Sequence, residues 1–367
     1  MRRLLFLIVA FIAYGSLYPW RFHFSPGVNP FSVVLHSWPV EWGRGELRDA
    51  VENVLLYFPL GAAAVLAATK RRASNLAIAT AGGFALSTAI ELTQVWVPGR
   101  DPSLDDILFN TLGTAIGAIT ALALAPWLRR VQVGREASAG ILLLGCWIGS
   151  QFFPFLPALK LYRLQREYLA LIHTRSLSLL DTWTNAAEWL AACLALELIL
   201  GRRHARWAAL AVGLLALRIF TPGHPVQAEE IVGAAAAALL WLIVPEALRR
   251  RAALALMISA VALRELAPFH FSAEPAPFAW IPFRASYEAE IEPRVIVILR
   301  KAFDYGALVW LLSTWRGLGY KRAAAISACA LLVCELAQRY LPGRTPEITD
   351  PVLAILMAIA LWVAETL

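Results

Sequence analysis

The chain has 367 residues, of which 59% are hydrophobic and 16% are charged. Soluble globular proteins average roughly 45–50% apolar and about 25% charged residues. Both deviations exclude a soluble enzyme, a disordered tail and a disulfide-bonded secreted scaffold, because so much apolar surface must face something other than water. The composition predicts an all-α integral membrane protein.

The net charge of +7 does not indicate a nucleic-acid partner, because the basic residues form small clusters between apolar runs and not a stripe or a tail. The cysteines also lie inside apolar runs and show no CxxC pair or metal-ligand spacing. We expect no metal and no cofactor, and we interpret as small buried hydrophobes the four thiols of Cys146, Cys193, Cys329 and Cys334.

The apolar runs predict the helices in chain order. A transmembrane helix needs about 20 mostly apolar residues, and this rule predicts about twelve spans. They lie near residues 4–20, 50–69, 76–97, 106–128, 137–156, 182–200, 207–221, 229–247, 252–267, 300–315, 323–341 and 351–366. The first span follows two arginines as in a signal peptide, but Ala13-Tyr14-Gly15 is a weak cleavage site, so we interpret it as an uncleaved helix.

The basic clusters predict which side each loop faces. Short loops rich in Lys and Arg stay on the cytoplasmic side, and every second loop carries such a cluster. We therefore predict an inner-membrane protein with both termini in the cytoplasm. The long external loops, which are rich in proline and aromatic residues, are expected to be either interfacial or re-entrant, and they cover residues 21–49, 157–181 and 268–299.

A repeated motif divides the chain into three parts. The stretch ELTQVWVPGRDPSLDD from Glu91 matches ELAQRYLPGRTPEITD from Glu335 at eight of sixteen positions. A degraded copy around Pro222-Gly223 has His224 in place of the arginine. We predict three four-helix units with the same membrane orientation, over residues 1–130, 131–248 and 249–367.

Polar residues inside the first unit form the candidate binding site. Glu91 lies about 10 Å from the end of its helix, where an ionised side chain is costly and a functional candidate by default. Gln94 shares its face. We expect a pocket at the external side that contains Glu52, Asn53, Glu91, Gln94, Arg100, Asp105, Asp106 and Asn110.

Structural roles compete with binding at several of these positions. Asp105 is equally well explained as a helix cap. A lesser alternative for Arg100 is a counterion that permits burial of a carboxylate. Gly113 and Gly117 follow Asn110 on one face, which favours close helix packing. The third copy repeats the set as Glu335, Gln338, Arg344 and Asp350, which is a second candidate site.

These residues resemble a known family. The pattern from Asn53 to Gly61, followed by Glu-x-x-Gln, Pro-Gly-Arg, Asp and Asn-x-x-Gly, is similar to the VanZ-like family over residues 10–125. That family is named for a membrane protein associated with resistance to glycopeptide antibiotics, particularly teicoplanin. The resemblance implies a four-helix membrane unit and brings no established reaction or cofactor.

Three functions fit this sequence. The first is a protein that binds or translocates the polar headgroup of an envelope lipid, a lipid-linked precursor or an envelope-active antibiotic such as a glycopeptide. The second is an intramembrane enzyme with Glu91 or Asp106 as general acid or base, although the chain has no nucleophile elbow, metal triad or phosphate loop. The third is a scaffold. We expect binding or transport, with membrane lipids as partners, and no catalytic residue is assigned.

Overall fold

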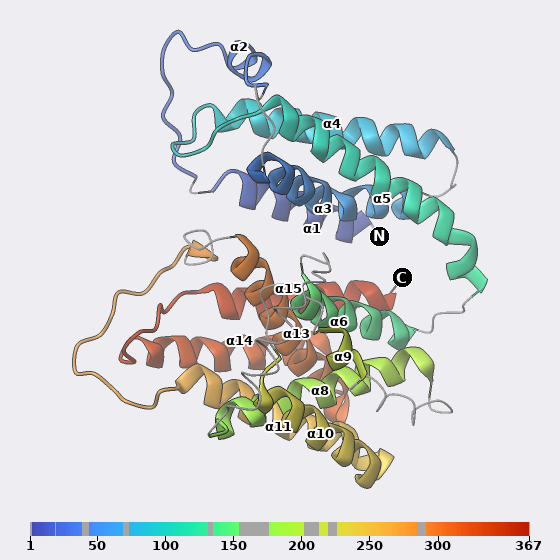
Figure 1. The fold of residues 1–367 in the computed structure, drawn as a ribbon, viewed down its shortest axis with the longest axis vertical. Coiled ribbons are helices and arrows are strands. Elements are labelled where there is room, and N and C mark those ends of the chain that lie inside the picture. The colour runs from blue at the N-terminus through green and yellow to red at the C-terminus, as the bar shows by residue number, and fades with distance from the viewer. Residues whose placement is uncertain are drawn as a thin grey trace. The chain divides into compact units, whose positions relative to one another are not determined.

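The computed structural model describes residues 2–18, 20–38, 44–68, 73–130, 135–153, 176–201, 213–218, 226–284 and 291–366. Within these ranges the chain is helical, and its β structure is a single isolated bridge between Ala279 and Glu347. The predicted all-α class is confirmed. The chain forms two compact units, Met1–Gln132 and Val133–Leu367 (Figure 1).

Unit 1 consists of four long helices and one short one. They are α1 (Arg2–Ser16), α2 (Pro30–Leu35), α3 (Arg44–Ala67), α4 (Ala73–Gln94) and α5 (Leu104–Arg130). Helix α5 packs along both α3 and α4, and α1 packs against α3, so the ribbons run side by side in Figure 1. The short helix α2 lies in the first long loop and contacts α4.

Glycines allow α3 and α5 to approach each other closely. A Cβ atom at Gly117 would collide with the backbone carbonyl of Phe58, and one at Gly113 would collide with that of Val54. Small residues at such positions let two membrane helices pack backbone to backbone. The predicted packing role of these two glycines is confirmed.

Unit 2 is a larger bundle. Its helices are α6 (Arg135–Phe152), α8 (Leu179–Leu200), α9 (Leu214–Arg218), α10 (Ala228–Ile243), α11 (Glu246–Leu266), α13 (Ile291–Thr314), the 3₁₀ turn η2 (Trp315–Gly317), α14 (Gly319–Gln338) and α15 (Thr349–Thr366). Helix α8 packs on α6, α10 and α11, while α13 packs on α6, α11, α14 and α15.

Buried aromatic rings join three helices of this bundle. Trp147 of α6 meets Trp189 of α8 edge to face, with ring centroids 4.6 Å apart. Phe303 of α13 lies on the other side of Trp147, at 6.3 Å between centroids. Such aromatic pairs stabilise a core beyond the area that they bury, and this cluster fixes α13 at the centre of the unit.

Five described helices are long and apolar enough to span a membrane. They cover Asp49–Ala67, Ser74–Gln94, Leu104–Leu124, Leu179–Leu200 and Thr349–Thr366. Helices α11 and α13 lie over two further predicted spans, but they carry charged residues within them. The chain is a helical membrane protein, and the total of twelve spans stays a prediction. Most of 207–221, the turn at Pro222-Gly223 and His224 lie outside the described residues.

Both described long loops are held against a Pro-Gly turn. In unit 1 the amide of His23 donates to the carbonyl of Trp96 at 2.8 Å. In unit 2 the amide of Ser272 donates to the carbonyl of Tyr340 at 2.6 Å. Residues 272–283 follow the segment 339–349 through further backbone hydrogen bonds, including the one between Ile348 and Ala279. The second long loop, 157–181, lies mostly outside the described residues.

Candidate functional site

The Pro-Gly turn that connects α4 to α5 has a counterpart between α14 and α15. Gly99 and Gly343 both adopt a left-handed backbone, with φ of 78° and 77°. Residues with a Cβ atom avoid this region, whereas glycine enters it without a steric penalty. The repeated Pro-Gly pair therefore produces the same reversal of direction in both units.

Glu91 holds the start of α5. Its carboxylate accepts a hydrogen bond from the backbone N–H of Ser103 at 2.9 Å, and the Glu91 side chain is 3% exposed. The Ser103 hydroxyl contacts the carboxylate of Asp105 and accepts from the amide of Asp106. The first amides of a helix have no partner within the helix, so Glu91 and Ser103 satisfy groups that would otherwise remain unpaired in the membrane.

Gln94 and Arg100 serve the end of α1. The Gln94 amide donates to the carbonyl of Ser16 at 2.8 Å. The Arg100 guanidinium donates to the carbonyls of Gly15 and Tyr18 at 3.0 and 3.2 Å. The last carbonyls of a helix lack helical partners, and basic side chains commonly bind them. These bonds add to the counterion role weighed for Arg100, because its positive charge also lies close enough to attract the carboxylates of Glu91 and Asp106.

The remaining predicted residues form two separate pairs. Asn53 of α3 donates to Asp106 of α5 at 2.6 Å. Farther along α5, Asn110 donates to the hydroxyl of Ser87 on α4 at 2.9 Å. Glu52 precedes Asn53 on α3 and is half-buried. The structure thus places the predicted residues among α1, α3, α4 and α5, where some of their described bonds fasten helix ends and others link neighbouring helices. A ligand pocket there stays a prediction.

The second motif makes the same bonds in unit 2. The Glu335 carboxylate accepts from the backbone N–H of Glu347 at 2.9 Å, as Glu91 does from a residue twelve positions later. Arg344 donates to the carbonyls of Ala267, at 2.9 Å, and of Arg264, at the end of α11. These contacts reproduce, around another helix end, the contacts that Glu91 and Arg100 make in unit 1. We call this pair of contacts, of the glutamate with a backbone amide and of the arginine with two carbonyls, the clamp.

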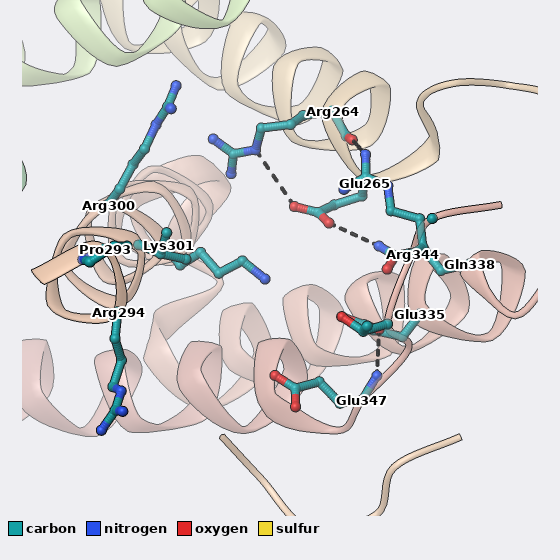
Figure 2. A pocket seen from close by; sticks show the side chains of 13 residues that line it. Arg264, Glu265, Pro293, Arg294, Arg300, Lys301, Glu335, Gln338, Arg344 and Glu347 are labelled. Atoms are coloured by element: carbon teal, nitrogen blue, oxygen red, sulfur yellow. Dashed lines mark hydrogen bonds and ion pairs between the residues drawn. The ribbon is translucent and has the colours of Figure 1, made fainter. Parts of the chain in front are cut away.

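A cavity of about 400 Å³ lies beside this second clamp. It is bounded by the end of α11, the first half of α13, the end of α14 and the turn before α15 (Figure 2). Its lining residues are Arg264, Glu265, Pro293, Arg294, Val297, Arg300, Lys301, Glu335, Gln338, Gly343, Arg344, Thr345 and Glu347. Of the second predicted set, three residues line this cavity, and Asp350 lies directly behind it.

Lys301 and Asp350 form the base of the site. The Lys301 ammonium donates to the two carboxylate oxygens of Asp350 at 2.7 and 2.9 Å. The Tyr305 hydroxyl donates to Asp350 at 2.5 Å and lies 3.1 Å from the carboxylate of Glu265. Gln338 donates to the other oxygen of Glu265 at 2.9 Å. The buried carboxylates are thus paired, as burial of charge requires.

A second charge cluster joins α8 to this site. Glu188, which is 3% exposed, accepts from Arg300 at 2.7 Å and from Arg264 at 3.3 Å. Arg264 also contacts Asp304 at 2.6 Å. Two arginines that line the cavity are therefore held in place by carboxylates from α8 and α13.

The charged residues of α8, α11 and α13 were missed from the sequence, although a signal was present. The reasoning that singled out Glu91, an ionisable residue inside an apolar span, applies equally to Glu188, Arg264, Glu265, Arg300, Lys301 and Asp304. No group of three or more His, Cys, Asp or Glu side chains arranged for a metal occurs within the described residues.

Comparison with known proteins supports the resemblance over one segment. The family model of VanZ/LLP1 matches residues 3–125, which include nearly all of α1, all of α2, α3 and α4, and most of α5. No curated protein and no solved structure matches the chain. The match ends within unit 1, so it does not extend to the copies predicted later in the chain. Residues 3–125 form a VanZ-like segment of this membrane protein.

Proposed function

We propose that the protein binds the polar headgroup of an envelope lipid or a lipid-linked precursor in the cavity at the junction of α11, α13 and α14. The observation that carries this proposal is a charged cavity of about 400 Å³ inside an apolar helical bundle. Sites for small molecules are typically clefts of about 300–1,000 Å³. Charges buried at membrane depth are costly and are kept where they serve a substrate or an ion.

An amphiphile suits the surroundings of the cavity better than a free solute does. Val297 lines the cavity and is 48% exposed, and Leu336, on the neighbouring α14, is 42% exposed. Exposed apolar side chains therefore accompany the charged lining on α13 and α14. A lipid combines both features, because its headgroup is charged and its chains are apolar.

Comparison of the two motifs favours unit 2 as the binding site. The clamp formed by the motif is common to both units, and what differs is the set of residues that it holds. Matching the clamp contacts aligns neutral residues of unit 1 with charged residues of unit 2, namely Gly15 with Arg264, Ser16 with Glu265 and Asn53 with Lys301. We infer that the motif builds the frame and that the added charges bind the ligand.

Lipid retention on purification tests the proposal. The double variant Lys301→Met/Asp350→Asn removes both members of a buried ion pair, which is often close to neutral for stability. We expect it to lose the lipid that the wild-type protein retains, measured by native mass spectrometry. Lys321→Met, an exposed lysine at the other end of α14, is the matched control and should retain it.

Other results would redirect or reject the proposal. Retention by the double variant together with loss in Glu91→Gln would place the site in unit 1. Loss of lipid from none of the variants would reject a headgroup site in either unit. Chemical conversion of an added lipid by the purified protein would favour the intramembrane enzyme.

A further inference from the structure

We propose that the cavity accepts a zwitterionic headgroup in which a phosphate and a primary ammonium are joined by a short linker, as in phosphatidylethanolamine. This inference rests on the proposed function and adds the chemical class of the ligand. It follows from how positive and negative side chains are distributed around the cavity, and from which of them are neutralised by the protein.

Cations and carboxylates both line the cavity, and Arg344 lies in the same turn as Glu347 (Figure 2). Helix α13 contributes three cations within eight residues, Arg294, Arg300 and Lys301. Glu335 and Glu347 lie on the facing side, from the end of α14 and the turn before α15. Figure 2 shows the Lys301 side chain extending from α13 into the space between these sides. A ligand that carries both charges can satisfy both sides at once, whereas a simple anion would face the carboxylates.

The basic groups are suited to a phosphate. Arg344 directs its described hydrogen bonds to backbone carbonyls, which are neutral acceptors, so these bonds leave its positive charge uncompensated. Lys301 carries three donor hydrogens. Its ammonium makes two contacts with Asp350, which leaves one hydrogen for a ligand. Ammonium and guanidinium groups form short, strong hydrogen bonds with phosphate oxygens.

The acidic side is suited to an ammonium with N–H donors. Glu335 already accepts a hydrogen bond from the Glu347 amide, and carboxylate oxygens accept several hydrogen bonds, so a ligand group beside it that supplies N–H donors or positive charge is favoured. Glu335 is 2% exposed, and water therefore does little to solvate it. A primary ammonium brings three donors and a charge to this position.

The lining also discriminates against a choline headgroup. Quaternary ammonium groups have no N–H donors and are typically bound in cages of aromatic rings. Among the described residues that line the cavity, none is aromatic. A glycerol headgroup offers hydroxyl donors but brings no positive charge to the carboxylates. Ethanolamine phosphate fits both conditions.

Lipids that share their acyl chains and differ in headgroup test this inference. The full-length protein is exchanged into nanodiscs that contain phosphatidylethanolamine, phosphatidylcholine, phosphatidylglycerol or phosphatidic acid, and bound lipid is counted by native mass spectrometry. We expect phosphatidylethanolamine to be retained at least about tenfold over the others, since one charge-assisted hydrogen bond to a buried group accounts for a factor of that order.

A pair of variants assigns the preference to the acidic side. Glu335→Gln keeps an oxygen that accepts the Glu347 amide but removes the charge, and it should abolish the preference for ethanolamine over glycerol. Glu274→Gln, which is exposed in the loop after α11, should keep the preference. A melting temperature within a few degrees of wild type confirms that Glu335→Gln is folded, and Glu347→Gln replaces it if it is not.

The outcomes distinguish a preference for a zwitterionic headgroup from headgroup binding in general. Equal retention of all four lipids, lost in Lys301→Met/Asp350→Asn, rejects the zwitterion and keeps the headgroup site. Preference for phosphatidylglycerol or phosphatidic acid also rejects it, because an anion alone then suffices. Retention of none of the four lipids rejects both.

Discussion

Arg100 and Arg344 have the same role at the end of a helix. Each guanidinium binds two carbonyls at the end of another helix, α1 or α11. In a membrane, unsatisfied backbone carbonyls cost several kcal/mol. Arginine is suited to this task because its fork presents several donors in fixed directions, whereas lysine is a single point of charge.

Arg100→Lys should therefore destabilise the protein although it conserves charge. Loss of one charged hydrogen bond costs about 1.5–3 kcal/mol, so we expect a clear fall in the melting temperature of the detergent-solubilised protein. The control is Arg322→Lys on the exposed start of α14, which should melt as wild type does. Equal melting of the two variants would contradict the clamp.

Glu188 is the second residue whose contacts predict a large effect. It lies between Arg264 and Arg300, and its neutralisation leaves two guanidinium groups with less compensation. Breaking a fully buried ion pair from one side typically costs about 3–5 kcal/mol, and this range is an upper bound here because the Arg300 side chain is 41% exposed. We expect Glu188→Gln to lower stability by that order in thermal unfolding, and Glu188→Gln/Arg300→Gln to recover part of the loss. No recovery in the double variant would indicate that Glu188 acts through packing.

The close contact between helices α3 and α5 depends on glycine. Gly117→Ala places a methyl group against the carbonyl of Phe58, and overpacking of this kind costs about 1–3 kcal/mol. Gly82→Ala on α4 meets nothing within 4 Å and gains up to about 1 kcal/mol of helix propensity. Thermal unfolding should show a loss for the first substitution and no loss for the second. Equal stability would mean that the two helices are farther apart.

The helices were more predictable than the site. Hydrophobic runs of about 20 residues are specified locally, and the predicted spans 76–97 and 351–366 agree with α4 and α15 within three residues. The site depends on contacts between distant segments, such as Gln338 with Glu265, 73 positions apart. No spacing within the motif encodes such a contact, so the motif predicted that its residues are important without predicting what they bind.

The matching clamps near the beginning and the end of the chain support an internal duplication. In both units a glutamate accepts the amide of the residue twelve positions later, and a loop amide binds the carbonyl two residues before the Pro-Gly pair. We infer that 249–367 repeats the arrangement of 1–130. The compact units do not follow thirds of the chain, because residues 133–367 pack as one body.

Membrane topology decides which leaflet supplies the ligand. Arg249, Arg250 and Arg251 lie at the start of α11, and the cavity lies at its other end. Basic residues beside a span stay in the cytoplasm, so the cavity should open toward the external leaflet. We expect an impermeant maleimide to label Ala273→Cys in intact cells and Ala247→Cys only after lysis, with the four native cysteines replaced by alanine. Both positions are exposed, Ala247 in the first turn of α11 and Ala273 in the loop that follows the helix. The reverse labelling would place the cavity at the cytoplasmic face, where the headgroup must come from the inner leaflet.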